Sequence, residues 1–155
     1  MTETPTFGSV EPVIEYAERR AAYVVVFSAD RVALVRGKQN YFLPGGGCEL
    51  SEAPEETITR EVREELARGI RLTRKLGDAV QYFYAPSDNM HYRMHAVFFA
   101  GEFTDELFDT DAEHEPEWLP VSDVERACFH PCHAWAVRQA LIHRRRETLR
   151  QRREN

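Results

Sequence analysis

Three glutamates lie close together near the middle of the chain, at Glu61, Glu64 and Glu65. On a helix, at about 100° per residue, their side chains fall within a sector of roughly 100°. Like charges at this spacing weaken a helix by roughly 0.2–0.5 kcal/mol per pair, so stability alone does not explain them. A hard divalent cation such as Mg²⁺ binds oxygen ligands and would turn the repulsion into attraction. The spacing therefore favours a metal site, with a solvated acidic face as the alternative.

The glutamates belong to a predicted helix at about 54–68, which follows a segment rich in glycine. We expect Ser51 to be the N-cap, and Pro54 suits the first turn of a helix. Glycines at 45–47 let the backbone approach a ligand closely, and we expect them to form a loop. The hydrophobic run at 41–43 predicts a short strand that ends at this loop.

The segment from the glycines to the end of the helix resembles the Nudix box, a motif written G-x5-E-x7-R-E-U-x-E-E-x-G-U, in which U is aliphatic. The matching residues are Gly46, Glu52, Arg60, Glu61, Val62, Glu64 and Glu65. Two positions depart from the motif, because Ala67 and Arg68 stand where the family has glycine and an aliphatic residue. The departure concerns the exit of the helix and touches no candidate metal ligand.

The resemblance implies a hydrolase that uses Mg²⁺, or alternatively Mn²⁺, to cleave the phosphoanhydride bond of a nucleoside diphosphate linked to another group. Nucleoside triphosphates, ADP-ribose or sugar nucleotides, and dinucleoside polyphosphates all stay open as substrates. The implied metal ligands are Glu61, Glu64 and Glu65, with a backbone carbonyl of Gly45 or Gly46. The alternative is a non-catalytic module that senses nucleotides on the same fold, although such a module would not need the complete glutamate set.

Hydrolysis requires that phosphate charge be neutralised and that a water be deprotonated at neutral pH, and a bound metal serves both needs. We expect Arg60 to orient a carboxylate through an ion pair with Glu52 or Glu64. The general base is either Glu64 or a downstream glutamate, Glu115 or Glu117, because members of the family often place an additional glutamate before a late strand.

Three further residues are candidate contacts of the substrate. Arg36 and Lys38 border the predicted polar loop at 37–40 and could face phosphate, although solvated surface cations explain them equally well. Tyr84 lies about where some dinucleoside polyphosphate enzymes carry a tyrosine. In a strand Tyr84 and Phe83 point to opposite faces, so one of them can pack in the core while the other lines a surface.

A second collection of ligand-type side chains occurs in the run CFHPCH at 128–133. Its spacing matches no structural zinc pattern, and Pro131 more simply marks the start of the last helix. The three cysteines of the chain include no CxxC motif, which predicts no disulfide framework and fits a reducing compartment.

The other elements predict an α/β fold, in which a mixed sheet lies between helices. Strands are expected at 21–28, 31–36, 71–75, 79–84, 91–103 and 118–121, a tight turn at 29–30, a loop at 104–117 and a closing helix at about 132–149. The segment 4–12 is expected to add an edge strand or to wrap the core, while 13–20 is ambiguous. The resemblance implies the same α/β/α sandwich.

Length and composition predict a single soluble domain over residues 1–155. The chain is 43% hydrophobic and 30% charged, and no segment approaches the roughly 20 apolar residues of a membrane span. The first residues lack the basic and apolar regions of a signal peptide, so we expect a cytoplasmic protein without a membrane partner. A nucleotide-type small molecule is the expected partner, and a homodimer stays open.

The net charge of −6 is distributed unevenly along the chain. Residues 144–155 contain six arginines and two glutamates, a balance of +4, which leaves −10 for residues 1–143. The acidic body argues against broad binding of nucleic acid. We expect the basic end to be the solvated end of the last helix.

Overall fold

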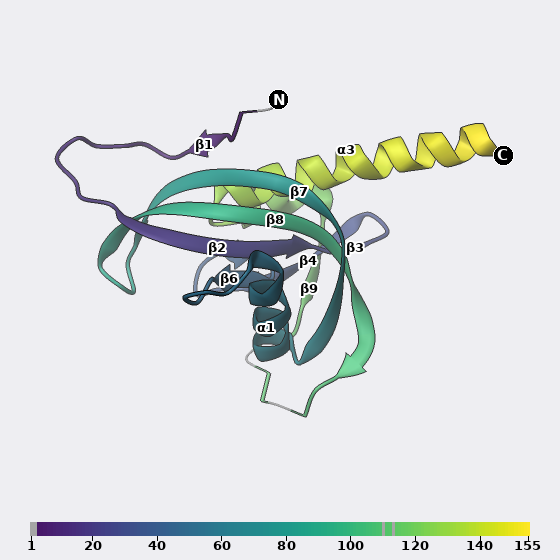
Figure 1. Cartoon of the computed structure of the whole chain (residues 1–155), viewed down its shortest axis with the longest axis horizontal. Helices are drawn as coiled ribbons and strands as arrows, with labels where there is room; N and C mark the ends of the chain where they lie inside the picture. The colour runs from purple at the N-terminus through teal and green to yellow at the C-terminus, as the bar shows by residue number, and fades with distance from the viewer. Residues whose placement is uncertain (1–2, 110, 113) are drawn as a thin grey trace.

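A computed structural model describes residues 3–109, 111–112 and 114–155. The main sheet is built from β1 (Thr6–Phe7), β7 (Arg68–Ala85), β8 (Met90–Leu107), β2 (Ala17–Val25) and β6 (Gly45–Gly47), in that spatial order (Figure 1). A smaller sheet contains β3 (Phe27–Ser28), β4 (Arg31–Arg36), β5 (Tyr41–Phe42) and β9 (Glu117–Pro120). The helices are α1 (Pro54–Leu66), a 3₁₀ turn (Val121–Asp123), α2 (Val124–Ala127) and α3 (Pro131–Glu154).

The main sheet is mixed. Strands β2 and β8 are parallel, as are β1 and β7, whereas β7 and β8 are antiparallel, as are β2 and β6. Helices α1 and α3 pack against opposite faces of this sheet. The predicted α/β fold with a mixed sheet and flanking helices is confirmed. Within the described ranges, no helix is both long and apolar enough to span a membrane.

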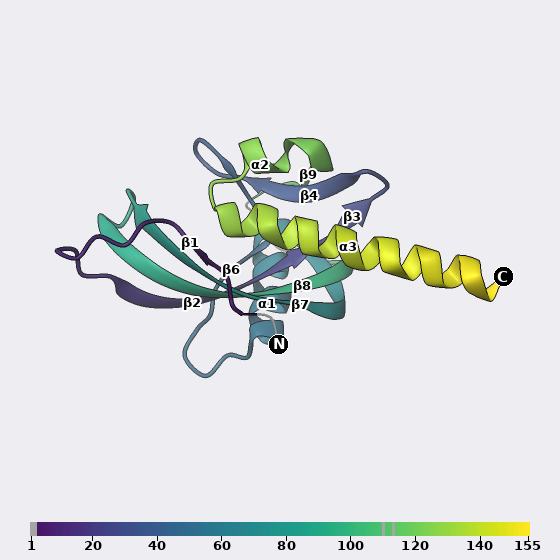
Figure 2. The same ribbon diagram turned by 90° about the horizontal axis from the view of Figure 1, so that it is seen from above.

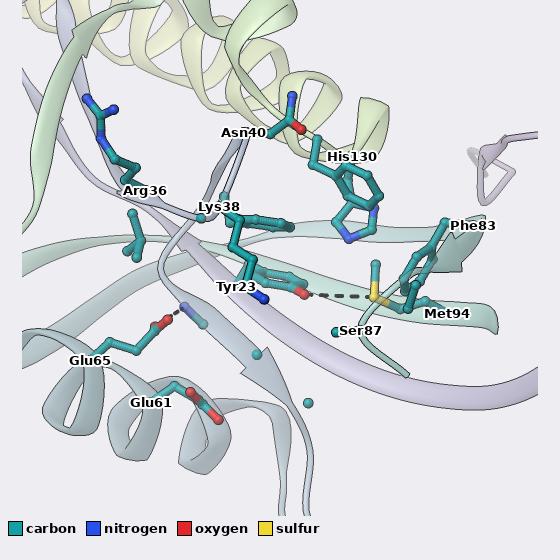
Figure 3. Close-up of a pocket in the computed structure, with 18 of the residues that line it drawn as sticks. Tyr23, Arg36, Lys38, Asn40, Glu61, Glu65, Phe83, Ser87, Met94 and His130 are labelled. Carbon is teal, nitrogen blue, oxygen red and sulfur yellow. Dashed lines mark hydrogen bonds between the residues drawn. The ribbon is translucent and has the colours of Figure 1, made fainter. Parts of the chain in front are cut away.

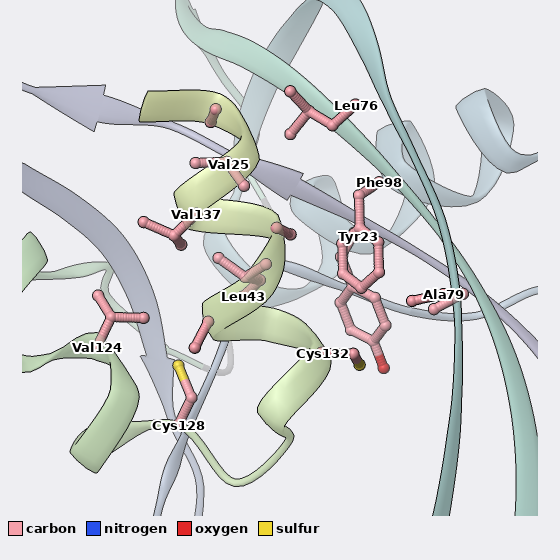
Figure 4. Packing of buried hydrophobic residues seen from close by; sticks show 14 of the residues in the cluster. Tyr23, Val25, Leu43, Leu76, Ala79, Phe98, Val124, Cys128, Cys132 and Val137 are labelled. Carbon is pink, nitrogen blue, oxygen red and sulfur yellow. The ribbon is translucent and has the colours of Figure 1, made fainter. Parts of the chain in front are cut away.

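Strand β2 separates two hydrophobic cores, because its successive side chains point to opposite faces. Tyr23 and Val25 join the core under α3, where Figure 4 shows them with Val137. Val24 joins the core under α1, which includes Val62. Burial on both faces explains why this strand reads as a continuous apolar run rather than an alternating one.

The structure resolves the two N-terminal segments, 4–12 and 13–20, whose conformation the sequence analysis left open. The expected edge strand is present as β1, and the ambiguous segment 13–20 supplies the start of β2 at Ala17. The predicted strand at 21–28 is interrupted at Val26, so its last two residues form β3. The predicted tight turn at 29–30 is confirmed and closes a hairpin, since Ser28 pairs with Arg31 across it.

The long hairpin of β7 and β8 differs from the prediction of two separate strands at 71–75 and 79–84. Strand β7 is continuous, and three register shifts against β8 absorb its irregular middle. Gly77, with φ of 138°, lies at one of these shifts and adopts a conformation that side chains rarely allow. The predicted loop at 104–117 starts later than expected, because β8 continues to Leu107, and its positions 110 and 113 lie outside the described residues.

The glycines at 45–47 form a strand, β6, rather than the predicted loop. Tyr23 pairs with Gly45 and Ala21 with Gly47 in an antiparallel ladder. A Cβ atom on Gly45 would collide with the backbone of β2, so only glycine fits this approach. A run of glycines carries no alternation of side chains, which is why its strand character could not be read from the sequence.

The start of α1 corrects the prediction of Ser51 as the N-cap. Ser51 has φ of 70° and lies outside the helix, while Ala53 occupies the N-cap position. The backbone N–H of Ala53 donates to Oε1 of Glu56 at 3.1 Å, which supplies an acceptor at the helix start without a capping side chain.

The closing helix α3 is longer than the predicted 132–149. It begins at Pro131, as the proline indicated, and continues to Glu154 through arginine, glutamate and glutamine, which are good helix formers. Figure 2 shows its last turns extending beyond the sheets, where Leu149 is exposed. This arrangement matches the expected solvated basic end.

Ala67 ends α1 in the left-handed conformation, with φ of 53° and ψ of 38°, at the position where the motif has glycine. A side chain in this conformation costs roughly 1 kcal/mol, and glycine avoids that cost but loses more entropy on folding. Ala67→Gly is therefore expected to raise the free energy of unfolding by about 0.5–1 kcal/mol, or the melting temperature by about 1–4 °C. Ala140→Gly, inside α3, should destabilise the protein. Thermal melts that show both variants destabilised would contradict the strain at Ala67.

Candidate active site

A pocket of about 800 Å³ opens beside β6 (Figure 3). At its carboxylate end lie Glu61, Glu65 and Gly45–Gly47. At its aromatic end lie Phe42, Phe83, Phe129 and His130. Tyr23 and Met94 line the floor between the two ends, with the Tyr23 hydroxyl 3.8 Å from the Met94 sulfur. The pocket therefore combines an acidic, glycine-lined wall with a nonpolar one.

Close packing of α1 against β6 brings two glutamates of the helix to the pocket. A Cβ atom on Gly46 would lie 2.9 Å from the carboxyl carbon of Glu61, so the carboxylate occupies space that any other residue would fill. The backbone N–H of Gly45 donates to Oε1 of Glu65 at 3.1 Å. The glycines thus serve the carboxylates directly, in addition to allowing the strand to form.

Arg60 connects most of the motif through one guanidinium group. Its Nε and Nη2 donate to the two carboxylate oxygens of Glu52 at 2.7 and 2.9 Å. Its Nη1 donates to Glu61 at 2.9 Å and to Glu64 at 3.2 Å, and Nη2 also reaches the carbonyl oxygen of Gly47 at 3.0 Å. Both of the ion pairs considered from sequence, with Glu52 and with Glu64, are present.

None of the three candidate bases is among the residues that line the pocket. The Glu64 side chain is 55% exposed and is held by Arg60. The Glu115 side chain is 88% exposed, with its carboxylate 3.9 Å from an arginine of β7. Glu117 accepts two hydrogen bonds from Arg36, at 2.8 and 3.0 Å, and a third from Tyr41 at 3.2 Å.

Of the candidate substrate contacts, the structure brings Arg36 and Lys38 to the pocket but not Tyr84. The Tyr84 hydroxyl donates to Oδ1 of Asn89 at 2.6 Å, on the β7–β8 turn. Phe83, which points to the other face of β7, lines the aromatic end instead. The sequence predicted that Phe83 and Tyr84 point to opposite faces of the strand, but it did not indicate which face carries the pocket.

The oxygen ligands of the carboxylate end suit a hard divalent cation. In the described part of the chain, no three His, Cys, Asp or Glu side chains form a group that could hold a metal, which applies to the predicted glutamate triad and to CFHPCH alike. Glu61 and Glu65, one turn apart on α1 and both lining the pocket, fit a cation such as Mg²⁺ or Mn²⁺, because such ions bind through one or two carboxylates and keep several waters.

The aromatic end surrounds His130 with rings. The centroid of its imidazole lies 4.6 Å from that of Phe83 and 4.7 Å from that of Phe129. Burial, with a smaller contribution from the positive charge of Arg19, lowers the pKa of His130 to about 4. The imidazole is consequently neutral at pH 7, and this end of the pocket suits a flat, uncharged ring system.

The sequence did not single out Arg19, His114 or His130 as members of the site, although all three line the pocket. For Arg19 a signal was available, since alternation along a strand puts it on the same face as Tyr23. The positions of the two histidines depend on chain segments that are distant from the motif, so no local pattern indicates them.

Comparison with known proteins gives consistent results. The NUDIX domain model matches residues 17–140. The putative ADP-ribose pyrophosphatase YjhB of Bacillus subtilis (strain 168) is 30% identical over 92 residues, which cover 57% of this chain and 43% of that protein. The match thus spans less than half of the length of this curated relative.

Solved structures resemble the fold. A NUDIX hydrolase from Nitrosomonas europaea aligns with a TM-score of 0.63 at 18% identity, over 82% of this chain and 90% of that one. An ADP-ribose pyrophosphatase from Streptococcus suis aligns with a TM-score of 0.57 at 18% identity, over 79% and 87%. At these identities the likeness concerns the fold.

Hydrogen bonds from Arg60 lower the pKa of Glu52 from 4.5 to about 2. A carboxyl group with a lowered pKa in the folded state stabilises the protein above its unfolded pKa, and this stabilisation is lost as the pH falls from about 4.5 to about 2. Glu52→Gln is therefore expected to be less stable than wild type at neutral pH, with a difference that shrinks below about pH 4.5. Urea unfolding across this range measures it, and a difference independent of pH would contradict the ion pair.

Proposed function

Because this chain belongs to the Nudix family, we propose that it is a pyrophosphohydrolase that cleaves the phosphoanhydride bond of a nucleoside diphosphate linked to another group. The observation that carries the proposal is the pocket itself, with two carboxylates and glycine backbone at one end and aromatic rings at the other. A substrate with a diphosphate and a flat base has matching parts. The non-catalytic alternative gives no reason for two pocket carboxylates of which Arg60 holds one and the N–H of Gly45 holds the other.

The chain's own residues position the reacting groups. Arg60 fixes the carboxylates of Glu61 and Glu64, and the N–H of Gly45 fixes that of Glu65. When bound at Glu61 and Glu65, a divalent cation would neutralise phosphate charge and lower the pKa of water. Among the base candidates we favour Glu64, since it lies on α1 next to Glu65 and half of its side chain is exposed to solvent.

The aromatic end offers surfaces for the base of the nucleotide. Phe83 and Phe129 present rings at nearly a right angle to each other, with centroids 6.2 Å apart. Such rings bind a planar base by stacking and edge contacts. ADP-ribose is the first substrate to test, because a relative with 30% identity carries the name of a putative ADP-ribose pyrophosphatase. Nucleoside triphosphates and dinucleoside polyphosphates follow in the same assay.

Metal dependence provides the direct test of this assignment. We expect hydrolysis of at least one nucleoside diphosphate derivative with Mg²⁺ or Mn²⁺, with release of a nucleoside monophosphate or a phosphorylated fragment, and no turnover in excess EDTA. Saturating Mg²⁺, at about 100 times its dissociation constant, should stabilise the wild type by roughly 2.7 kcal/mol in thermal melts. Glu65→Gln should lose most of this gain together with turnover.

Glu55→Gln is the matched control, since Glu55 is exposed in the first turn of the same helix and does not line the pocket. It should keep both the response to Mg²⁺ and the turnover. Equal stabilisation of wild type and Glu65→Gln by Mg²⁺ would show that the metal does not bind at Glu65. Robust hydrolysis in EDTA would refute the metal-dependent mechanism.

A further inference from the structure

Three cationic side chains line the pocket, and they differ in what their charges already contact. Arg36 is engaged by Glu117 through two hydrogen bonds, at 2.8 and 3.0 Å. Lys38 is exposed, so water solvates its ammonium group. Arg19 is partly buried, and among the residues that the structure describes no carboxylate lies within ion-pair distance of it. Arg19 is therefore the least exposed of the three cations, and it also has no anionic partner among the described residues.

The surroundings of Arg19 leave one buried donor of its guanidinium, Nε, without an acceptor. Its Nε is buried and has no hydrogen-bond partner within the described ranges. Its Cζ lies 5.6 Å from the centroid of the Tyr92 ring, and the guanidinium also acts on the Tyr92 hydroxyl through a side-chain hydrogen bond, so Tyr92 orients the group while Nε keeps no acceptor. Because a buried charged donor without an acceptor is costly, this arrangement favours an acceptor supplied by a ligand.

Strand β6 leaves room for Arg19 at the edge of the carboxylate end. A Cβ atom on Gly47 would lie 3.3 Å from Nη2 of Arg19, closer than most side-chain contacts, so glycine at this position keeps the guanidinium where it is. The positive charge also acts on Tyr23, whose pKa is raised by burial and partly lowered again by Arg19. In Figure 3, Tyr23 lies between the two glutamates and His130. Arg19 therefore touches the carboxylate end at Gly47, and its charge also lowers the pKa of His130 at the aromatic end.

We propose that Arg19 binds a phosphoryl oxygen of the substrate's diphosphate at the junction between the carboxylate end and the aromatic end. The identity of the anion rests on the proposed function, while the need for an anion rests on the contacts of Arg19. A guanidinium presents donors in a planar fork that matches two oxygens of a phosphate. Arg36, which the sequence offers together with Lys38 as a candidate phosphate contact, is instead held in the pocket wall by Glu117.

The test uses inorganic pyrophosphate as the probe, titrated into wild type, Arg19→Gln, Arg19→Lys and Arg93→Gln by calorimetry with saturating Mg²⁺ present. Wild type should bind, and Arg19→Gln should bind about 10- to 100-fold more weakly, the range expected for loss of a charged hydrogen bond. Arg19→Lys keeps the charge but not the fork, so its affinity should fall between these two. Arg93 is the matched control, because it lies on the neighbouring strand β8, pairs with Glu18 and does not line the pocket.

The expected kinetic result is a similar fall in kcat/KM for Arg19→Gln on any substrate that wild type hydrolyses, with Arg93→Gln unchanged. The inference is overturned if wild type does not bind pyrophosphate, if Arg19→Gln binds it as wild type does, or if Arg93→Gln loses as much. If Arg19→Gln alone loses pyrophosphate but wild type hydrolyses no nucleoside diphosphate derivative, the anion site stands and the proposed function fails. Partial recovery in Arg19→Lys separates a loss of charge from a loss of folding.

Discussion

The site depends on Arg60 and on the acceptors that it holds together. The Arg60 side chain is only 22% exposed, and its guanidinium joins a loop glutamate, two helix glutamates and the carbonyl of Gly47. Without this cation, the carboxylates of α1 would repel one another across a single turn. With it, they are fixed in a cluster in which negative charge stays concentrated near the pocket. The same contacts tie α1 to β6, so the ion-pair network sets both the electrostatics and the geometry of the site.

Such close packing restricts what β6 can contain. Gly46 faces the carboxylate of Glu61, and Gly47 faces the guanidinium of Arg19. The glycine strand therefore separates an anionic group on one side from a cationic group on the other, with no side chain between them. A methyl group at either position would displace a charged group rather than a flexible hydrocarbon. Side-chain contacts thus require glycine at positions 46 and 47, whereas Gly45 is required by the backbone of β2 and by its positive φ.

Most of the frame of the site could be predicted from the sequence, because its signals are local. The motif spacing identified the helix, and the apolar run of β2 identified the central strand. The errors concern features set by distant segments. The strand pairing of the glycines depends on β2, and the choice of Phe83 over Tyr84 depends on which face of β7 the start of the closing helix packs against. Arg19 was not predicted as part of the site because a charged stretch before an apolar run, here Glu18, Arg19 and Arg20, is also typical of an ordinary solvated strand end.

The difference between the two ends of the pocket also favours one orientation of a bound substrate over the other. Burial keeps His130 neutral at pH 7, so the aromatic end offers no positive charge to a phosphate. Arg19 is the partly buried cation of the pocket, and the carboxylates at the opposite end would repel a diphosphate until a divalent cation screens them. A nucleotide entering with its base toward Phe83 places its phosphates near Arg19 and the carboxylate end. The reverse orientation would bury phosphate against uncharged rings, at a large desolvation cost, and is disfavoured.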